Sequence, residues 1–127
     1  MSIEGQITNV NEYQLVVDPS DYVEAISALA RRTEAEGVRG VLRYQFYVHD
    51  DGKRAAATIE FRDADAWLEH HRLAYTWPEM ETLQASVRLT KLTFLGPLND
   101  EINAMVSGID VPVDRYDSLA AGFARTT

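Results

Sequence analysis

The sequence predicts an α+β domain with a ferredoxin-like antiparallel sheet and two helices on one face. Three observations support this fold class. Segments of period two and segments of period three to four alternate in the order strand, helix, strand, strand, helix, strand. An Asp-Gly pair between the two middle strands is typical of a hairpin turn. A chain of 127 residues has room for one core. We therefore expect one ferredoxin-like domain over residues 1–97 and a C-terminal arm over residues 98–127, which packs on the same domain or on a partner subunit.

Four strands are expected from the alternation of apolar and polar residues. Tyr13, Leu15 and Val17 alternate in a first strand over about 11–17, with an extended lead from Gln6. The other three are expected over 38–48, 55–61 and 86–95, and the Asp-Gly turn lies between the second and the third.

The helices are bounded by recognisable start and stop residues. Asp18 and Pro19 stand at the N-cap and the first helical position of a helix that runs to Gly37. Asp63 caps a second helix that ends near Tyr75. A proline disfavours a helical residue before it, so Pro78 begins a shorter helix over about 78–85.

The strand patterns predict apolar residues on both faces of the sheet. Val41 and Tyr47 fall on the poorer face of the second strand, and Leu92 and Phe94 fall opposite Leu89 on the last. Two helices cover only one face, and a large exposed apolar patch usually marks an interface. We expect a second copy to cover the open face, which makes a two-fold homodimer.

Composition excludes several classes of function. The formal charge of −8 without a basic cluster argues against nucleic acid as the main partner. No apolar run is long enough to cross a bilayer, and without a secretion signal at the N-terminus we expect a cytoplasmic protein with no membrane partner. There is no cysteine, and adjacent histidines lack the spacing of three or four that a helical metal site needs, so we expect no metal. A small-molecule ligand remains as the partner to expect.

Residues 11–97 resemble the antibiotic biosynthesis monooxygenase-like family of small dimeric α+β barrels. The specific likeness is the run from Glu60 to His70, in which a strand ends in an aromatic residue and is followed by a polar turn, an Ala-Leu-like pair and a histidine. The resemblance implies that Phe61 lines a cavity between sheet and helices and that His70 points into it. Trp67 stands where the family more often has Leu, and the segment after Pro97 is longer than usual. Related barrels include cofactor-free oxygenases, haem degraders and isomerase-like enzymes.

His70 is the candidate catalytic residue, because an imidazole can take a proton from a phenol or anthrone and leave a carbanion that reacts with oxygen. The alternative is a histidine that only packs between helix and sheet. His71 lies about 100° away around a helix, so we expect it at the surface, as we expect His49 in the hairpin. The candidate substrate-binding residues are Tyr44, Phe46, Phe61, Trp67, Trp77 and Arg88. Plain core packing is the more common role for the aromatic residues among them. For Arg88, as for Arg43, a solvated edge position or an ion pair with Glu60 is favoured over binding of an oxyanion.

These observations favour a monooxygenase that needs neither metal nor flavin and acts on a small aromatic or polyketide-like molecule. The alternative is a non-catalytic binding protein of the same fold, for a small molecule or for haem with His70 as axial ligand. The apolar residues of the arm, which include Ile102, Met105 and Phe123, are expected to contact the partner subunit or the mouth of the cavity.

Overall fold

The structure is a computed structural model that describes residues 3–125. Its elements, in chain order, are β1 (Ile7–Leu15), α1 (Pro19–Glu36), β2 (Val41–Val48), β3 (Arg54–Phe61), α2 (Ala64–Ala74), α3 (Pro78–Ser86), β4 (Val87–Leu95), α4 (Asp100–Val106) and β5 (Val113–Tyr116). The sheet has the strand order β2-β3-β1-β4-β5, antiparallel except for the β4–β5 pair. The first four strands have the ferredoxin-like order. The predicted fold class is therefore confirmed, with α4 and β5 added by the segment after Pro97.

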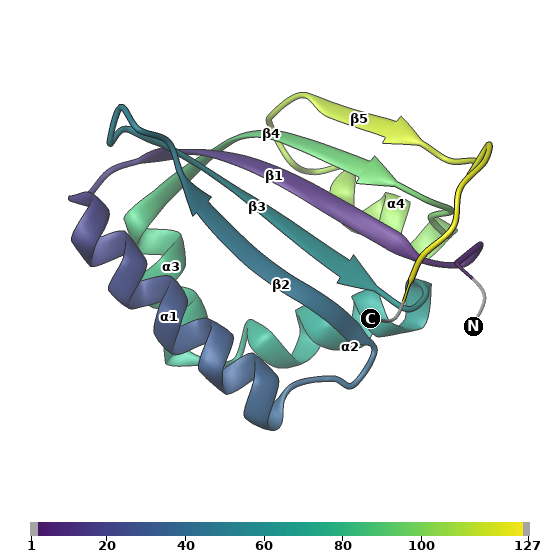
Figure 1. Cartoon of the computed structure of the whole chain (residues 1–127), viewed down its shortest axis with the longest axis horizontal. Helices are drawn as coiled ribbons and strands as arrows, with labels where there is room; N and C mark the ends of the chain where they lie inside the picture. Colours follow the sequence, from purple (N-terminus) through teal and green to yellow (C-terminus); the bar gives the residue numbers. More distant parts are fainter. Residues whose placement is uncertain (1–2, 126–127) are drawn as a thin grey trace.

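All the helices lie on one side of the sheet (Figure 1). Helices α1 and α3 pack against each other under one end of it. Helix α2 lies under β2 and β3, and α4 lies toward the β4 edge, where its Ile102 and Val106 are buried against residues such as Phe94. No helix within residues 3–125 has the length and apolarity needed to cross a membrane.

Two irregularities in strand register place apolar residues on the helix side and correct the predicted faces. Val41 pairs with Phe61 but Arg43 pairs with Glu60, so Leu42 is an extra residue in β2. Val41 consequently packs against the core, contrary to the prediction.

The second irregularity is in β4. Tyr13 pairs with Leu89 but Glu12 pairs with Lys91, which leaves Thr90 as the extra residue. The prediction that Leu92 and Phe94 lie opposite Leu89 was wrong, because an inserted residue reverses the alternation that follows it. Leu92, Phe94 and Leu89 all lie on the helix side.

The open face of the sheet is therefore more polar than the sequence indicates. Arg43 and Glu60 form an ion pair of 3.0 Å across β2 and β3. This is the ion-paired alternative that the sequence left open for Arg43. Lys91 and Asp114 form another of 3.2 Å across β4 and β5. A few large apolar side chains remain exposed there, namely Tyr47, Leu95 and Tyr116.

Side-chain caps fix where the site-bearing helices begin. Asp63 accepts a hydrogen bond of 2.9 Å from the amide of Ala66 at the start of α2, as predicted. Asn99 does the same for Ile102 at the start of α4. Helix α3 begins at Pro78, also as predicted.

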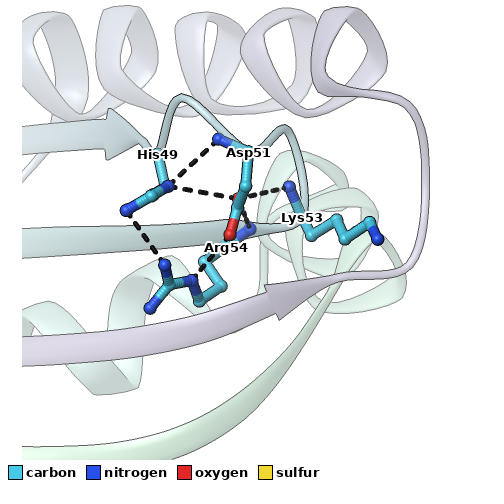
Figure 2. A network of polar contacts seen from close by, with 4 residues as sticks. All are labelled: His49, Asp51, Lys53 and Arg54. Atoms are coloured by element: carbon cyan, nitrogen blue, oxygen red, sulfur yellow. Dashed lines mark hydrogen bonds and ion pairs between the residues drawn. The ribbon is translucent and has the colours of Figure 1, made fainter.

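The β2–β3 hairpin turns at the expected Asp-Gly pair, where Gly52 has φ +68°. Around this turn the backbone amide of Asp51 donates to Nδ1 of His49, and the Arg54 side chain contacts both the Asp51 carboxylate and Nε2 of His49 (Figure 2). His49 is half exposed, as predicted.

Candidate functional site

Two hydrophobic clusters fill the layer between sheet and helices, and the candidate site lies among them. A cavity of about 270 Å³, here named the α3 cavity, is bounded by members of both clusters. Its lining residues are Asn11, Tyr13, Tyr44, Phe46, Ile59, His70, His71, Tyr75, Met80, Leu83, Gln84, Val87 and Leu89. None of these side chains is an acid, a lysine or an arginine. The cavity thus suits an uncharged ligand.

His70 is buried in this site without a polar partner. Its side chain is 2% exposed and projects from the buried face of α2. The ring lies edge-on to Tyr44, with centroids 5.5 Å apart, and 5.6 Å from the ring of Phe61. No side chain or backbone group within residues 3–125 is hydrogen-bonded to it. Burial, and to a lesser extent the nearby His71, lower the pKa of His70 to about 3, so the imidazole is uncharged at neutral pH.

His71 also lines the α3 cavity, so the prediction that it lies at the surface was wrong. Its ring stacks on Trp67 at 3.7 Å, and its centroid is 5.3 Å from that of His70. The Nδ1 atom lies 2.7 Å from the carbonyl oxygen of Trp67, which can only accept, so Nδ1 carries the proton and Nε2 is an acceptor. Burial lowers the pKa of His71 to about 4, although the bond to Trp67 opposes the shift. The 100° between neighbouring residues on a helix does not separate the two rings, because His70, His71 and Tyr75 all line the same cavity.

Asn11 and Tyr13 place a polar pair on the sheet wall. The Nδ2 atom of Asn11 donates to the hydroxyl of Tyr13 at 2.9 Å, while the Oδ1 atom of Asn11 is buried and has no hydrogen-bond partner in the described part of the chain. Burial raises the pKa of Tyr13 to about 12, against the opposing effect of the Asn11 bond, so the hydroxyl keeps its proton. An unpaired buried acceptor is costly, so Asn11 is ready to receive a donor from a ligand.

A second cavity of about 350 Å³, here named the α4 cavity, adjoins the first. Its lining residues are Asn9, Asn11, Trp67, His71, Arg72, Tyr75, Leu89, Leu92, Met105, Val106 and Ile109. The Nε1 atom of Trp67 donates to Oδ1 of the buried Asn9 at 3.2 Å. Arg72, the one charged side chain of this lining, forms an ion pair of 2.9 Å with Glu101 of α4.

The structure brings together some of the predicted site residues and separates others. His70, Tyr44 and Phe46 line the α3 cavity, and Trp67 lines the α4 cavity. Phe61 is fully buried behind the histidine rings and lines neither.

Two predicted site residues lie elsewhere. Trp77 is buried in the cluster under α1, where the guanidinium of Arg32 stacks over its ring at 4.9 Å. Arg88 is exposed on the open face of the sheet and donates to Gln14 of β1.

Sequence reasoning missed the two asparagines of β1. The strand begins at Ile7 and not near Asn11, so Ile7, Asn9, Asn11, Tyr13 and Leu15 share the helix side. Two asparagines among the apolar residues on one face of a strand could have indicated a polar site, because buried polar groups need hydrogen-bond partners. The prediction began the strand at about Asn11 and assigned no role to its side chain.

Two other features of the structure are weaker candidates for a site. A larger hollow of about 620 Å³ lies beside the β2–β3 hairpin, but its His49, Asp51 and Arg54 are exposed and bonded to one another. Within residues 3–125 no group of three or more His, Cys, Asp or Glu side chains is placed to hold a metal ion. The α3 cavity is the better candidate, because it combines the unpaired Oδ1 atom of Asn11 with the buried rings of His70 and His71.

Comparison with solved structures identifies the architecture. No family model matches the sequence, and no curated protein matches it significantly. MupZ from Pseudomonas fluorescens is 16% identical with a TM-score of 0.70, and the match covers 95% of each chain. SnoaB from Streptomyces nogalater, a cofactor-independent oxygenase, is 17% identical with a TM-score of 0.57 over 71% of this chain and 90% of its own. A Caulobacter crescentus protein assigned to the antibiotic biosynthesis monooxygenases is 15% identical with a TM-score of 0.60 over 72% of this chain and 89% of its own.

The fold is that of the antibiotic biosynthesis monooxygenase-like proteins. The resemblance inferred from the run Glu60–His70 is confirmed at this level. At these identities, likeness establishes the monooxygenase-like fold alone. The match to MupZ covers nearly the whole chain, so it extends into the segment after Pro97.

Proposed function

We propose that the protein oxygenates a small, uncharged aromatic or polyketide-like molecule in the α3 cavity, without metal or flavin. The observation that carries this proposal is the buried, uncharged and unpaired imidazole of His70 in a cavity free of charged side chains. An imidazole with no hydrogen-bond partner among residues 3–125 is available to a ligand. His70 is the proposed proton acceptor.

The proposed reaction converts an activated CH₂ group, such as that of an anthrone, to a carbonyl. His70 takes one proton, and the resulting carbanion gives an electron to O₂, after which the two radicals join in a C–O bond. The imidazolium returns its proton to the peroxide. The remaining C–H proton then leaves, the O–O bond breaks, and water departs. The substrate carbon supplies all four electrons, so one oxygen atom enters the product and the other leaves as water.

The low pKa of His70 shapes this chemistry. Burial penalises an isolated imidazolium, but proton transfer creates the imidazolium beside a new anion, and opposite charges attract strongly in a medium of low polarity. His70 is unprotonated at every physiological pH, so no fraction of the enzyme is lost to a protonated base. The aromatic walls supplied by Tyr44 and Phe46 also limit water, which would otherwise reprotonate the carbanion.

Oxygen uptake with a panel of anthrones, quinols and catechols tests the proposal. We expect at least one compound to consume one O₂ per molecule of product, with one atom of ¹⁸O₂ in the product and the other in water. Chelation and flavin depletion should leave the rate unchanged. A panel without protein-dependent uptake, or a rate that follows added flavin or metal, contradicts the proposal. The description of SnoaB as a cofactor-independent oxygenase supports the choice of panel.

A second candidate function is non-catalytic binding of such a molecule. It is favoured by the pKa values of about 3 and 4 for the two histidines, because efficient general bases usually have a pKa near the working pH. A co-purifying ligand that native mass spectrometry finds unchanged after long aerobic incubation would support binding. Turnover of that ligand would exclude it.

We further propose that two copies associate through the open face of the sheet. Tyr47, Leu95 and Tyr116 are exposed there, and Leu119 and Phe123 are exposed in the segment after β5, which could reach the second copy. Light scattering should give twice the chain mass of 14.3 kDa at micromolar concentration. A mass near 14.3 kDa contradicts this arrangement.

A further inference from the structure

The α3 cavity and the α4 cavity share one set of wall residues. Asn11, His71, Tyr75 and Leu89 line both, and we name this set the waist. Asn11 and Leu89 belong to the sheet, whereas His71 and Tyr75 belong to the end of α2. Two cavities with four lining residues in common lie side by side, with the waist between them. A ligand that spans both cavities has two ends and a middle.

The waist presents hydrogen-bond acceptors. The Oδ1 atom of Asn11 is buried without a partner in the described chain, and the Nε2 atom of His71 is an acceptor because Nδ1 carries the proton. An acceptor buried without a donor costs stability, so a ligand that supplies a donor gains more than it would at a surface. A hydroxyl at the middle of a ligand meets this need.

The two ends are apolar. Met80, Leu83 and Val87 line the α3 cavity, and Leu92, Val106 and Ile109 line the α4 cavity. The charge of Arg72 is paired with Glu101, so neither end calls for a charged group. Apolar arms on both sides of the hydroxyl would be buried at a gain of about 25 cal/mol per Å² in area terms.

The segment after Pro97 builds the far wall. Asn99 caps α4, whose Ile102 and Val106 are anchored in the core, and this places Met105 and Ile109 at the α4 cavity. The ion pair between Arg72 and Glu101 ties α4 to α2. The α4 cavity therefore exists because α4 packs on its own chain.

We propose that the site takes an elongated, uncharged molecule with a hydroxyl near its middle, which the waist binds while apolar arms occupy the two cavities. This proposal specifies the substrate class of the proposed function, and it rests on that function in one respect, namely that the substrate binds in the α3 cavity. His71 and Asn11 are binding residues in this arrangement, and His70 lies to one side, in the α3 cavity. The preferred substrate class is a hydroxylated chain or linked ring system that is apolar at both ends.

Positional isomers of one alcohol test the arrangement. Undecan-6-ol and undecan-1-ol have the same atoms, but only the first can place its hydroxyl at the waist with an arm on each side. We expect undecan-6-ol to bind about tenfold more tightly in calorimetric or NMR titration, since one well-buried hydrogen bond or one buried arm is worth about that factor. Equal affinities, or tighter binding of undecan-1-ol, would overturn the proposal.

Filling variants test the two ends separately. Met105→Trp and Gln84→Trp each add bulk at an exposed lining position, in the α4 and the α3 cavity respectively, so the fold should survive. The matched controls are the exposed neighbours Ala104→Trp and Ala85→Trp, which line neither cavity. We expect each filling variant to weaken undecan-6-ol binding about tenfold and each control to stay within about twofold. Undecan-6-ol binding that is indifferent to Met105→Trp overturns the two-cavity arrangement.

Removal of the acceptors tests the waist. Asn11→Leu, or His71→Phe if the first variant does not fold, should bring the two isomers to similar affinity. A preference for undecan-6-ol that survives both changes contradicts a role for the waist. These alcohols are not oxygenase substrates, so binding is scored apart from oxygen uptake. Uptake with an anthrone but no isomer preference overturns this inference alone, and an isomer preference without any uptake overturns the oxygenase proposal alone.

Discussion

The three histidines of the chain lie in two contrasting places. His49 is in the β2–β3 hairpin, where Asp51 Nα–H donates to its Nδ1 at 3.0 Å, Arg54 lies 3.0 Å from its Nε2, and half of the side chain is exposed. His70 and His71 are in the α3 cavity, where the cavity-facing side of each ring has no partner in residues 3–125. The hairpin has more polar contacts, and the cavity has more unmet hydrogen-bonding capacity. Buried polar groups without hydrogen-bond partners point to a ligand site, because burial without a partner is costly. The exposed network of the hairpin stabilises the turn only.

The largest expected effect concerns His70. His70→Gln should lower the rate of oxygen uptake by about 10²-fold or more, because general-base catalysis typically contributes 10²- to 10⁴-fold. The matched control His49→Gln should keep the rate within about twofold. Initial rates at saturating substrate measure both. Similar losses in the two variants would remove the contrast between cavity and hairpin.

The second prediction is a pH dependence of stability. A folded-state pKa below the unfolded value means that the unfolded chain binds more protons between the two values. The stability that His70 and His71 contribute is therefore fully present above the unfolded histidine pKa of about 6.5. It is lost as pH falls toward their folded pKa values of about 3 and 4.

Between pH 6.5 and 5, where few carboxylates titrate, each buried histidine should contribute a slope of at most about 1.4 kcal/mol per pH unit. Urea unfolding at pH 7, 6 and 5 measures that slope. His70→Phe should reduce this slope. A wild-type stability that is flat over this range would show that the cavity histidines are hydrated.

The third prediction compares two buried tryptophans, one whose indole nitrogen donates a hydrogen bond and one whose indole nitrogen does not. Trp67→Phe removes the donor to Asn9, whose side chain is 3% exposed, and should cost about 1–3 kcal/mol in the free energy of unfolding. Trp77→Phe is the control, because its indole nitrogen has no hydrogen bond in the described residues. Denaturant unfolding should give a clearly smaller loss for Trp77→Phe. Equal losses would assign the effect to ring size and not to the bond.

The sequence predicted the element order well because the signals are local. Asp63 as N-cap, Pro78 at the start of α3 and the turn at Gly52 depend on short-range geometry. The faces of β2 and β4 were not predictable in the same way. One extra residue, Leu42 in β2 or Thr90 in β4, moves the side chains that follow it to the opposite face of the sheet. The residue types at these positions do not indicate a bulge.

The candidate site divides along similar lines. His70 could be predicted as a candidate because it follows a recognisable strand–turn–helix run. The waist combines Asn11 from β1 with His71 from α2, sixty residues apart, and their approach depends on tertiary packing. The prediction that His71 lies at the surface was wrong. The angle of 100° between consecutive residues on a helix does not determine how much of the helix circumference a cavity contacts.

The smallest expected effect is in the hairpin. Asp51 accepts hydrogen bonds from the amides of Lys53 and Arg54 and from the Arg54 side chain, and these lower the pKa of its carboxyl to about 2 (Figure 2). The carboxyl is at the surface, so solvent screens the gain. Because the folded value is depressed, the contribution is present above the unfolded aspartate pKa of about 3.9 and is lost as pH falls through about 2.

Asp51→Asn should therefore lower the melting temperature slightly at pH 6, and the difference from wild type should shrink steadily between about pH 4 and pH 2. Asp50→Asn is the matched control, since Asp50 is in the same turn and makes no polar side-chain contact in the described part of the chain. Thermal melts followed by circular dichroism measure both. Oxygen uptake by Asp51→Asn should equal that of the wild type, because His49, Asp51 and Arg54 do not line the α3 cavity that holds His70. A loss of uptake in this variant at unchanged stability would assign the hairpin a part in the site and end the distinction between the two regions.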